Sequence, residues 1–548
     1  MEDVKNRLKE VIKESFNFDV EPEVTVAPGN VEADFSSNVA MQMARELHKA
    51  PFEIAEQIAE KMSDFKAVAM RPGFLNFISP DEYFVNIIKD YSNNFDEKIS
   101  CDKYLNENII CEYSDPNPFK VLHVGHLYTS VVGDSISRLY EYAGAKVIRA
   151  NFGGDVGLHV AKTVYILRKG NNENLTIEKI AKAYVEGTRA YEEDEKAKKE
   201  ITELNKEIYR INKENIREGV VAEIYWRGRE LSYQYFDDFY AGIGVKFDKY
   251  YPESSVSDLG LSKVKEQLDK GVYEMSNGAV VFNGEKFGLH TRVFINNEGV
   301  PTYEAKDVGL IFTKWADYHF DKSIMITGNE QLDYMKVVLK SVEQYAPDLV
   351  EKTSHLTHGM VKLPGNVKMS SRKGNFLKAV DVLEMISNNL AEMKDKADKK
   401  VVLAATKYSF LKSKLGGDII FDPKESVSMT GNSGVYLLYS AVRAKKILSK
   451  IDFGKEVNGV FEMSEHEKEL AKKVAQYKDV LVEAVDGMSP HTLCNYLYSL
   501  SQEFSRFYEN VQVAGSEFEV ERGGFVKTYY KIMEHGLKLL GIEIPEEM

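Results

Sequence analysis

The stretch Asn108-Ile109-Ile110-Cys111-Glu112-Tyr113, followed by His123-Val124-Gly125-His126, decides the fold of this chain. The apolar first part predicts a β-strand, and Pro116 and Pro118 end it because proline cannot donate to a strand ladder. Beyond the histidines, apolar residues recur at near-helical spacing, and Lys146-Val147-Ile148-Arg149 predicts a second strand. A strand, a helix and a strand of this length predict one right-handed crossover unit of a parallel sheet.

The histidine turn, His123 to His126, falls where such a sheet binds ligands. Ligands lie at the carboxyl ends of the strands beside a helix N-terminus, where free N–H groups and the helix dipole favour phosphate. Gly125 has no Cβ and would let a nucleotide approach the backbone closely. Taken alone, the motif fits a helix start with two solvated histidines equally well.

A second motif, Lys368-Met369-Ser370-Ser371-Arg372-Lys373-Gly374-Asn375, follows Pro364-Gly365-Asn366 and is predicted to be a polar loop. Such loops are usually only solvated. A cationic loop paired with a histidine turn instead favours binding of nucleotide phosphates, so the two motifs together predict that ATP is cleaved here.

On these residues the chain resembles a class I aminoacyl-tRNA synthetase, and within that class an arginyl-tRNA synthetase. The resemblance extends over nearly the whole chain, and several independent matches in the right order argue against chance. The matching stretches are Glu112 to Pro118, His123 to His126, Gly133-Asp134, Tyr303 to Asp307, His358 to Val361, Gly431 to Tyr436 with Tyr439 and Arg443, and Leu539 to Ile542 with Pro545 and Met548.

The resemblance implies a multidomain α/β fold. We expect a small α/β N-terminal domain in residues 1–90, which in the family contacts the tRNA elbow. We expect a Rossmann-type parallel-sheet catalytic domain with an insertion in residues 91–385, and an all-helical anticodon-binding domain in residues 386–548. A chain of 548 residues with 43% hydrophobic content also exceeds what one core organises. The charged stretch Tyr191 to Lys213 predicts a solvated helix with weak ion pairs.

The implied activity is ligation of arginine to tRNA. Arginine would attack ATP to give arginyl-adenylate and pyrophosphate, and the arginyl group would pass to the 3′-terminal adenosine of tRNA(Arg), releasing AMP. Mg²⁺ is expected with ATP as a counter-charge. Cys101, Cys111 and Cys494 form no C-x-x-C pair, so we expect small core residues and neither a disulfide framework nor structural zinc. The net charge of −14 argues against indiscriminate nucleic-acid binding but allows a local basic track for tRNA.

The second motif departs from the class pattern, because Ser371 stands where a second lysine is usual. A hydroxyl cannot supply a cation there. We hypothesise that Lys120, three residues before His123, replaces the missing charge; the alternative is an ordinary surface lysine. The implied catalytic residues are Lys120, His123, His126 and Lys368. The implied ATP site comprises His123, Gly125, His126, Lys368, Met369, Ser370 and Ser371.

Specificity for arginine requires carboxylates, because a guanidinium presents a fixed fork of donors. The resemblance assigns Glu112, Tyr303 and Asp307 to the guanidinium pocket, and a helix would put Tyr303 and Asp307 on one face. It assigns Asn117 and Gln331 to the backbone end of the amino acid. Taken singly, each residue has a plain structural explanation as a strand-edge, turn or helix-surface polar group.

Candidate tRNA-binding residues lie in the C-terminal region: Asn432, Tyr436, Tyr439 and Arg443. Interleaved aromatic and basic side chains are suited to stacking on bases. The pattern alone favours tyrosines in a helix core, whereas the resemblance favours contact with tRNA.

Other functions stay open at this point. A synthetase for cysteine would be expected to have zinc ligands, and one for lysine would not need two carboxylates. A non-catalytic tRNA-binding paralogue fits Ser371 but does not need an intact histidine turn, and a small-molecule nucleotidyltransferase has no use for the helical C-terminal region. Without a membrane-length apolar stretch or a signal-peptide pattern, we expect a cytoplasmic protein, and the resemblance implies a monomer.

Overall fold

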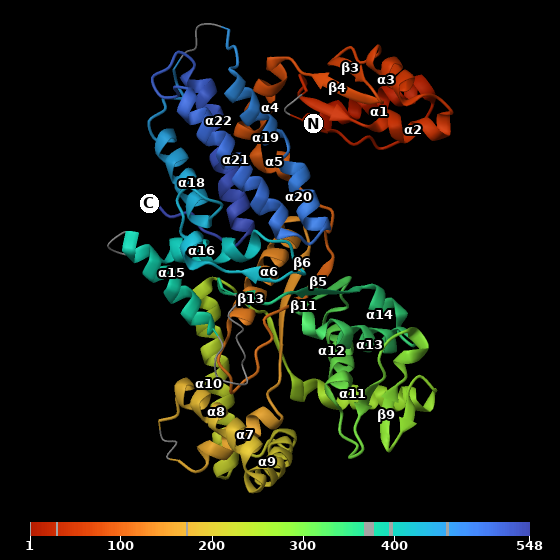
Figure 1. The fold of residues 1–548 in the computed structure, drawn as a ribbon, viewed down its shortest axis with the longest axis vertical. Helices are drawn as coiled ribbons and strands as arrows, with labels where there is room; N and C mark the ends of the chain where they lie inside the picture. Colours follow the sequence, from red (N-terminus) through yellow and green to blue (C-terminus); the bar gives the residue numbers. More distant parts are fainter. Residues whose placement is uncertain (1, 29–30, 171–173, 366–376, 394–397, 456–459) are drawn as a thin grey trace.

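A five-stranded parallel sheet lies at the centre of the elongated molecule (Figure 1). The computed structural model describes residues 2–28, 31–170, 174–365, 377–393, 398–455 and 460–548. The order of the strands in the sheet is β12-β11-β5-β6-β7. Their bounds are β5 (Asn108–Glu112), β6 (Lys146–Gly153), β7 (Lys249–Pro252), β11 (Lys322–Gly328) and β12 (Thr353–His358).

The predicted strand–helix–strand unit is confirmed, since α6 (Val124–Tyr142) connects β5 to the parallel strand β6. The chain adds β7 beyond β6, and later adds β11 and β12 on the opposite side of β5. The strand order therefore reverses between β5 and β11. In open parallel sheets, ligands bind outside the carboxyl ends of the strands at such a reversal.

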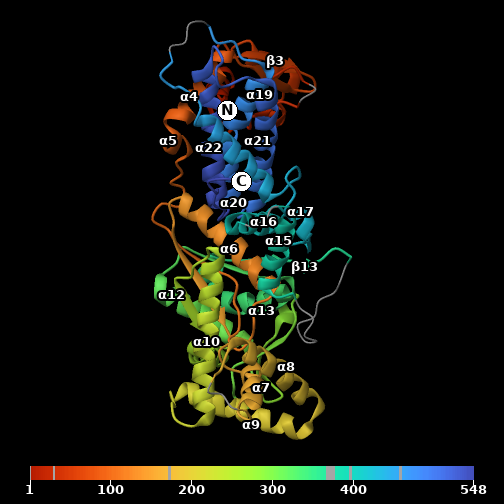
Figure 2. The same cartoon turned by 90° about the vertical axis from the view of Figure 1, so that its left-hand side faces the viewer.

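Helix α6 is a central element, because most of its side chains are buried. It lies against β5 on one side and the C-terminal helices on the other (Figures 1 and 2). Gly133 allows the close approach to Tyr113: a Cβ at Gly133 would lie 2.1 Å from Cγ of that ring.

Replacing Gly133 by alanine is therefore expected to lower the free energy of unfolding by about 1–3 kcal/mol, because the methyl group overpacks a buried aromatic contact. Chemical denaturation followed by circular dichroism would measure the change. The matched control is Gly242→Ala, since no atom lies within 4 Å of a Cβ at Gly242. Equal effects of the two substitutions would contradict the prediction.

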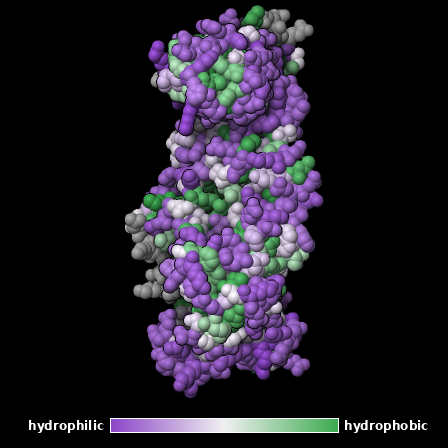
Figure 3. All heavy atoms as spheres, turned by 90° about the vertical axis from the view of Figure 1, so that its right-hand side faces the viewer, coloured by the Kyte–Doolittle hydropathy of each residue, from purple (hydrophilic) through white to green (hydrophobic). Residues whose placement is uncertain are grey.

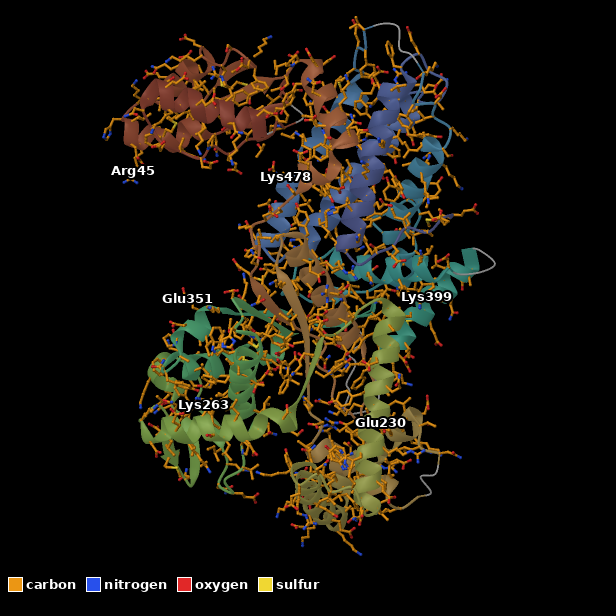
Figure 4. All side chains as sticks on the ribbon, turned by 180° about the vertical axis from the view of Figure 1, so that it is seen from behind. Arg45, Glu230, Lys263, Glu351, Lys399 and Lys478 are labelled. Atoms are coloured by element: carbon orange, nitrogen blue, oxygen red, sulfur yellow. The ribbon has the colours of Figure 1, made fainter. Side chains whose placement is uncertain are left out.

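Two lobes follow the carboxyl ends of the strands, and Figure 4 separates Glu230 on one from Lys263 and Glu351 on the other. The first lobe contains α7 (Leu158–Leu167), α8 (Ile177–Glu193), α9 (Glu195–Lys213) and α10 (Val220–Ile243). The second contains α11 (Glu253–Asp269), β8 (Glu274–Ser276), β9 (Ala279–Phe282), η1 (Gly284–Phe287), β10 (Arg292–Ile295), α12 (Tyr303–Tyr318), η2 (Asn329–Gln331), α13 (Leu332–Glu343) and α14 (Pro347–Glu351).

The prediction of one solvated helix from Tyr191 to Lys213 is wrong in two respects. The helix is interrupted at Asp194, which separates α8 from α9. The carboxylate of Asp194 caps α9 by accepting from the backbone N–H groups of Lys196 and Ala197. One face of α9 is also buried in the first lobe. Ion pairs do occur on the exposed face, such as Lys206 with Glu203 at 3.1 Å. The charged residues hid an apolar stripe of Ala197, Ile201, Leu204, Ile208 and Ile211.

The N-terminal part forms an antiparallel sheet in the order β1-β2-β4-β3 with helices packed on it. Its elements are α1 (Glu2–Phe16), β1 (Thr25–Val26), β2 (Phe35–Ser37), α2 (Val39–Leu47), α3 (Pro51–Ala59), β3 (Lys66–Met70) and β4 (Phe74–Ile78). Helices α4 (Asp81–Asn93) and α5 (Phe95–Ile99) then lead to β5, and α4 packs against α19 and α22 of the C-terminal bundle.

The C-terminal part is almost entirely helical, as predicted from about residue 386. Its elements are β13 (Val361–Lys362), α15 (Ala379–Met393), α16 (Lys399–Leu411), β14 (Ile419–Ile420), α17 (Pro423–Ser426), α18 (Gly434–Leu448), α19 (Glu465–Ala475), α20 (Tyr477–Asp486), α21 (Pro490–Asn510) and α22 (Glu519–Leu539).

The surface and the cysteines agree with the composition. The face in Figure 3 is mainly hydrophilic, with small hydrophobic areas. Within the described ranges, no helix is both long and apolar enough to cross a bilayer. None of the three cysteines is in a disulfide; Cys111 and Cys494 are buried as expected, whereas Cys101 is only partly buried.

Candidate active site

The histidine turn is the amino end of α6, and its two imidazoles cap that helix. Nδ1 of His123 accepts the N–H of Gly125 at 3.1 Å, and Nδ1 of His126 accepts the N–H of His123 at 3.1 Å. The rings stack with centroids 3.7 Å apart. A Cβ at Gly125 would lie 2.9 Å from Cε1 of His123, so the glycine makes room for the ring itself as well as for the predicted nucleotide.

These caps fix the protonation of both rings. Since each Nδ1 accepts a backbone N–H, a neutral ring carries its proton on Nε2. Burial, followed by the nearby charge of Lys120, lowers the pKa of His123 to about 4. Burial and the neighbouring His123 hold the pKa of His126 well below its usual range. At neutral pH both rings are therefore uncharged, and each carries its proton on Nε2.

Lys120 lies close to this turn. Its positive charge contributes to the lowered pKa values of His123, His126 and His159. Its ammonium also sits 5.1 Å from the centre of the Tyr184 ring, in a cation–π contact with the first lobe. The side chain is only partly exposed. Lys120 is thus a partly covered cation beside the histidines, and its replacement of the missing loop charge stays a prediction.

The segment that follows the second motif pairs with the histidine turn. Val124 donates its N–H to the carbonyl of Leu377 at 2.9 Å, and Ala379 donates to the carbonyl of Leu122 at 3.0 Å. The predicted loop residues Lys368, Met369, Ser370 and Ser371 lie outside the described residues. The two motifs, distant in sequence, are therefore joined through the backbone that flanks them.

Four carboxylates act on one another electrostatically around α12, namely Glu112, Glu253, Glu304 and Asp307. We call these four residues the carboxylate cluster, and three of them are paired with cations. The buried Glu112 accepts from Lys314 Nζ at 2.8 Å. Glu253 is bonded to Lys306, and Glu304 lies 3.4 Å from Arg292. Each of these three charges is thus compensated within the protein. A role of Glu112 in binding arginine stays a prediction.

Asp307 differs from these carboxylates, because it has no cationic partner among the residues that the structure describes. Its carboxylate accepts the hydroxyl of Tyr334. Burial and the charges of Glu112, Glu253 and Glu304 raise the pKa of Asp307 to about 7. Tyr303, one helical turn earlier on α12, is 67% exposed. Asp307 is thus the member of the carboxylate cluster whose charge no described cation offsets.

Asn117 has a fixed orientation. Its Oδ1 accepts the N–H of Gly154 at 2.7 Å, so its amide N–H₂ group is left to donate. His159 bonds the carbonyl of Gly154 at 2.8 Å, which secures the same turn after β6. Gln331 is exposed at the end of η2, directly after β11. Asn117 and Gln331 therefore follow the two strands that flank the strand-order reversal.

Some residues of this site were missed by sequence reasoning. Lys314 and Tyr334 compensate or hold the pocket carboxylates, but no local pattern marks them, because their partners are distant in the chain. Gly154-Asp155 could have been found as a glycine-rich turn directly after a strand. The buried Asp155 accepts Arg229 Nε at 3.0 Å and Ser254 Oγ at 2.8 Å, which connects the first lobe to the second.

The candidate tRNA-binding residues lie on or beside α18. Asn432 accepts the hydroxyl of Tyr408 at 2.5 Å. Tyr436 is partly buried, with its hydroxyl 3.3 Å from the carbonyl of Ser501. Tyr439 is 39% exposed, and the guanidinium of Arg443 stacks over the ring of Tyr508 at 3.7 Å. Tyr439 and Arg443 thus offer an aromatic and a basic surface, while Tyr436 belongs mostly to the helix packing.

Metal ligands are not gathered in this site. Among the described residues, no group of three or more His, Cys, Asp or Glu side chains could hold a metal ion.

Comparison with known proteins gives a consistent family. Three family models match in order: "Arginyl tRNA synthetase N terminal domain" on residues 2–78, "tRNA synthetases class I (R), catalytic domain" on 93–421, and "DALR anticodon binding domain" on 437–548. The chain is 31% identical to an arginine–tRNA ligase of Borrelia garinii subsp. bavariensis over 92% of this chain and 91% of that protein. It is 29% identical to the arginine–tRNA ligase of Clostridium perfringens over the whole of both.

The fold has close solved counterparts as well. The arginyl-tRNA synthetase of Thermus thermophilus superposes with a TM-score of 0.80 over 100% of both chains, at 22% sequence identity. At that identity the likeness concerns the fold.

Proposed function

Since the chain belongs to the arginyl-tRNA synthetase family of class I, we propose how its residues divide the work of an arginine–tRNA ligase. The enzyme uses ATP to join arginine to tRNA. The observation that carries the assignment is the 31% identity to an arginine–tRNA ligase along 92% of the chain. The roles of individual residues below are inferred from their chemistry and geometry.

We assign arginine binding to the carboxylate cluster near the carboxyl end of β5. The guanidinium would bind Asp307, whose charge has no cation partner among the described residues, and the exposed Tyr303 would cover it. Glu112 accepts a hydrogen bond from Lys314, and its negative charge would still contribute to the potential at Asp307. The N–H of Gly154 binds the Asn117 Oδ1, so the amide N–H₂ of Asn117 would donate to the carboxylate of arginine. Gln331 would bind the α-ammonium group of arginine.

We assign ATP binding to the histidine turn and the second motif. In the first step a carboxylate oxygen of arginine attacks the α-phosphorus, the bond to the pyrophosphate oxygen breaks, and negative charge grows on the phosphoryl oxygens. The Nε2–H groups of His123 and His126 would donate to those oxygens without changing protonation. Preorganised donors at that place lower the barrier. We also assign Lys368, Met369, Ser370 and Ser371 to binding ATP, on their chemistry alone.

In the second step the arginyl group would move from the adenylate to a hydroxyl of the 3′-terminal ribose of tRNA(Arg), releasing AMP. We assign residues 1–90 to binding the tRNA elbow, 91–385 to catalysis and 386–548 to binding the anticodon. Tyr439 and Arg443 would stack on bases. Asn432 and Tyr436 would hold that surface in shape. We further propose that Mg²⁺ arrives with ATP, and that the enzyme is a cytoplasmic monomer.

Charging assays test this function directly. Purified protein is incubated with ATP, total tRNA and each radiolabelled amino acid in turn. Charging by arginine alone is expected. Charging by lysine, or tRNA binding without charging of any amino acid, would contradict the assignment.

Lys120 is expected to supply the cation that Ser371 cannot. Lys120→Met should lower the rate of adenylate formation about 10²-fold, because a charge at the phosphates stabilises the transition state. Ser371→Ala should change the rate less than threefold, since a hydroxyl adds little charge stabilisation. Pyrophosphate exchange with tRNA present measures both. A near-normal rate for Lys120→Met would refute the replacement.

A further inference from the structure

The carboxyl end of α22 is held by side chains from two helices outside its own length. Ser135 Oγ on α6 donates to the carbonyl of Leu539 at 3.1 Å. Lys407 Nζ on α16 donates to the carbonyl of Gly541 at 2.6 Å. The last carbonyls of a helix have no partner within it and carry the negative end of its dipole, so donors and cations stabilise them.

Arg138 extends this contact to a second helix. Its Nη1 donates to the carbonyl of Lys538 near the end of α22, and its Nη2 donates to the carbonyl of Gly244 at the end of α10, both at 3.4 Å. Asp134 holds Arg138 in place by accepting its Nε at 2.7 Å. We call Asp134, Ser135, Arg138 and Lys407 the capping cluster. It joins the C-terminal bundle and the first lobe to α6.

The capping cluster lies on the helix that begins with the histidine turn. Arg138 follows His126 by twelve residues, which at 1.5 Å per residue is about 18 Å along the helix axis. In Figures 1 and 2 the lower end of the C-terminal bundle meets α6 and α16. Because α6 is a continuous helix, a tilt at the capping cluster moves the histidines at its other end.

Lys407 is a costly residue for packing alone. It is buried, and the loss of hydration lowers its pKa to about 8 despite the opposing charge of Asp134. Arg138 and Glu543 face it as well. An apolar side chain of similar length would pack there without desolvating a charge, and buried ion pairs are often no more stable than such replacements. The cation therefore points to a geometric role.

We propose that Lys407 and Arg138 are positioning residues for adenylate formation, which fix α6 against the carboxyl ends of α22 and α10 so that the histidine turn is aligned with ATP. The inference rests on the role proposed for that turn. Loosening the cluster misplaces His123 and His126 without removing any group that touches substrate. Misplacement on the scale of 1 Å costs up to about 10²-fold in rate.

The test compares pyrophosphate exchange, with arginine and tRNA present, in the full-length enzyme and its variants. Lys407→Met removes the hydrogen bond that Lys407, on α16, donates to the carbonyl of Gly541. Gly541→Ala strains the same contact from the segment just after α22, because a Cβ there would lie 2.9 Å from Lys407 Nζ and 3.0 Å from Asp134 Oδ2. The matched control is Lys531→Met, since Lys531 Nζ caps the carbonyl of Ser92 at the end of α4, at 3.1 Å and away from α6.

Both cluster variants are expected to lower kcat about tenfold, with KM for ATP and Kd for tRNA within twofold of wild type; Lys531→Met should match wild type. The His126→Asn background provides the decisive comparison. If Lys407 acts through the histidines, Lys407→Met should lower the rate less than twofold there. Fully multiplying effects, an unchanged kcat in both cluster variants, or an equal loss in Lys531→Met would overturn the inference. A harmless His126→Asn would instead refute the proposed role of the turn.

Discussion

Replacing Asp307 by asparagine is expected to lower kcat/KM for arginine about 10³-fold, mainly through KM. The variant keeps the size of the side chain but removes a carboxylate charge that has no cation partner among the described residues. A guanidinium buried without its carboxylate loses a charged hydrogen-bonded pair, which costs about 4 kcal/mol. Pyrophosphate exchange over a range of arginine concentrations, with tRNA present, measures the change.

The matched control for this substitution is on the same helix. Asp317, also on α12, accepts the hydroxyl of Tyr251 at 3.0 Å, as Asp307 accepts that of Tyr334. It is not a member of the carboxylate cluster and is paired with Lys249 at 3.1 Å. Asp317→Asn should leave KM for arginine within twofold of wild type. A similar KM in Asp307→Asn would mean that the guanidinium binds elsewhere.

The raised pKa of Asp307 makes arginine binding depend on pH. Because that pKa is about 7, the carboxylate is mostly protonated at pH 6 and mostly ionised at pH 8. Only the ionised form attracts the guanidinium. KM for arginine is therefore expected to rise about tenfold from pH 8 to pH 6, and Asp307→Asn should abolish this dependence while KM for ATP stays flat.

The second large effect is a loss of rate on replacing His126, whose two ring nitrogens have different roles. Nδ1 accepts the N–H of His123, and Nε2 is left as the donor. His126→Asn keeps an acceptor near the Nδ1 position but loses the donor, so kcat for adenylate formation should fall about 10²–10³-fold with an intact fold. His126→Gln places an amide N–H₂ near the Nε2 position and should retain about tenfold more rate than the asparagine variant.

Single-turnover formation of arginyl-adenylate measures both histidine variants, and circular dichroism checks the fold. If the glutamine variant were slower than the asparagine variant, capping of the helix would matter more than donation to phosphate. The low pKa values of both histidines also predict no histidine-dependent change in rate between pH 6 and 8.

Local sequence patterns predicted the parts of the fold that depend on neighbours in the chain. The run from Asn108 to Tyr113 and the spacing after His126 located β5 and α6 correctly. The position of both histidines at the start of a helix was also predictable, because they belong to one short motif that follows a strand. The prediction of a solvated helix from Tyr191 to Lys213 was wrong, because the apolar stripe of this stretch is narrow and charged residues dominate its composition.

The compensation of charge in the pocket could not be predicted from the sequence. Glu112 and Lys314 are 202 residues apart and Asp307 and Tyr334 are 27 apart, and nothing local indicates either pairing. The sequence gives no reason to distinguish Glu112 from Asp307 as a partner of the guanidinium. The structure distinguishes them, because only one is left without a cation among the described residues.

The order of strands in the central sheet has a consequence for the synthesis of the chain. Asn108, the first residue of β5, donates its backbone N–H to the carboxylate of Asp321, which directly precedes β11 and lies 213 residues later in the chain. At about 5–20 residues per second, a ribosome needs roughly 10–40 s to make that interval. Until then the edge of β5 that β11 will cover presents unpaired backbone groups, and exposed strand edges promote aggregation. Helix α4 stays without its packing partners for longer, because α19 and α22 are synthesised near the end of the chain. The nascent chain is therefore most in need of a chaperone after its first half has left the ribosome.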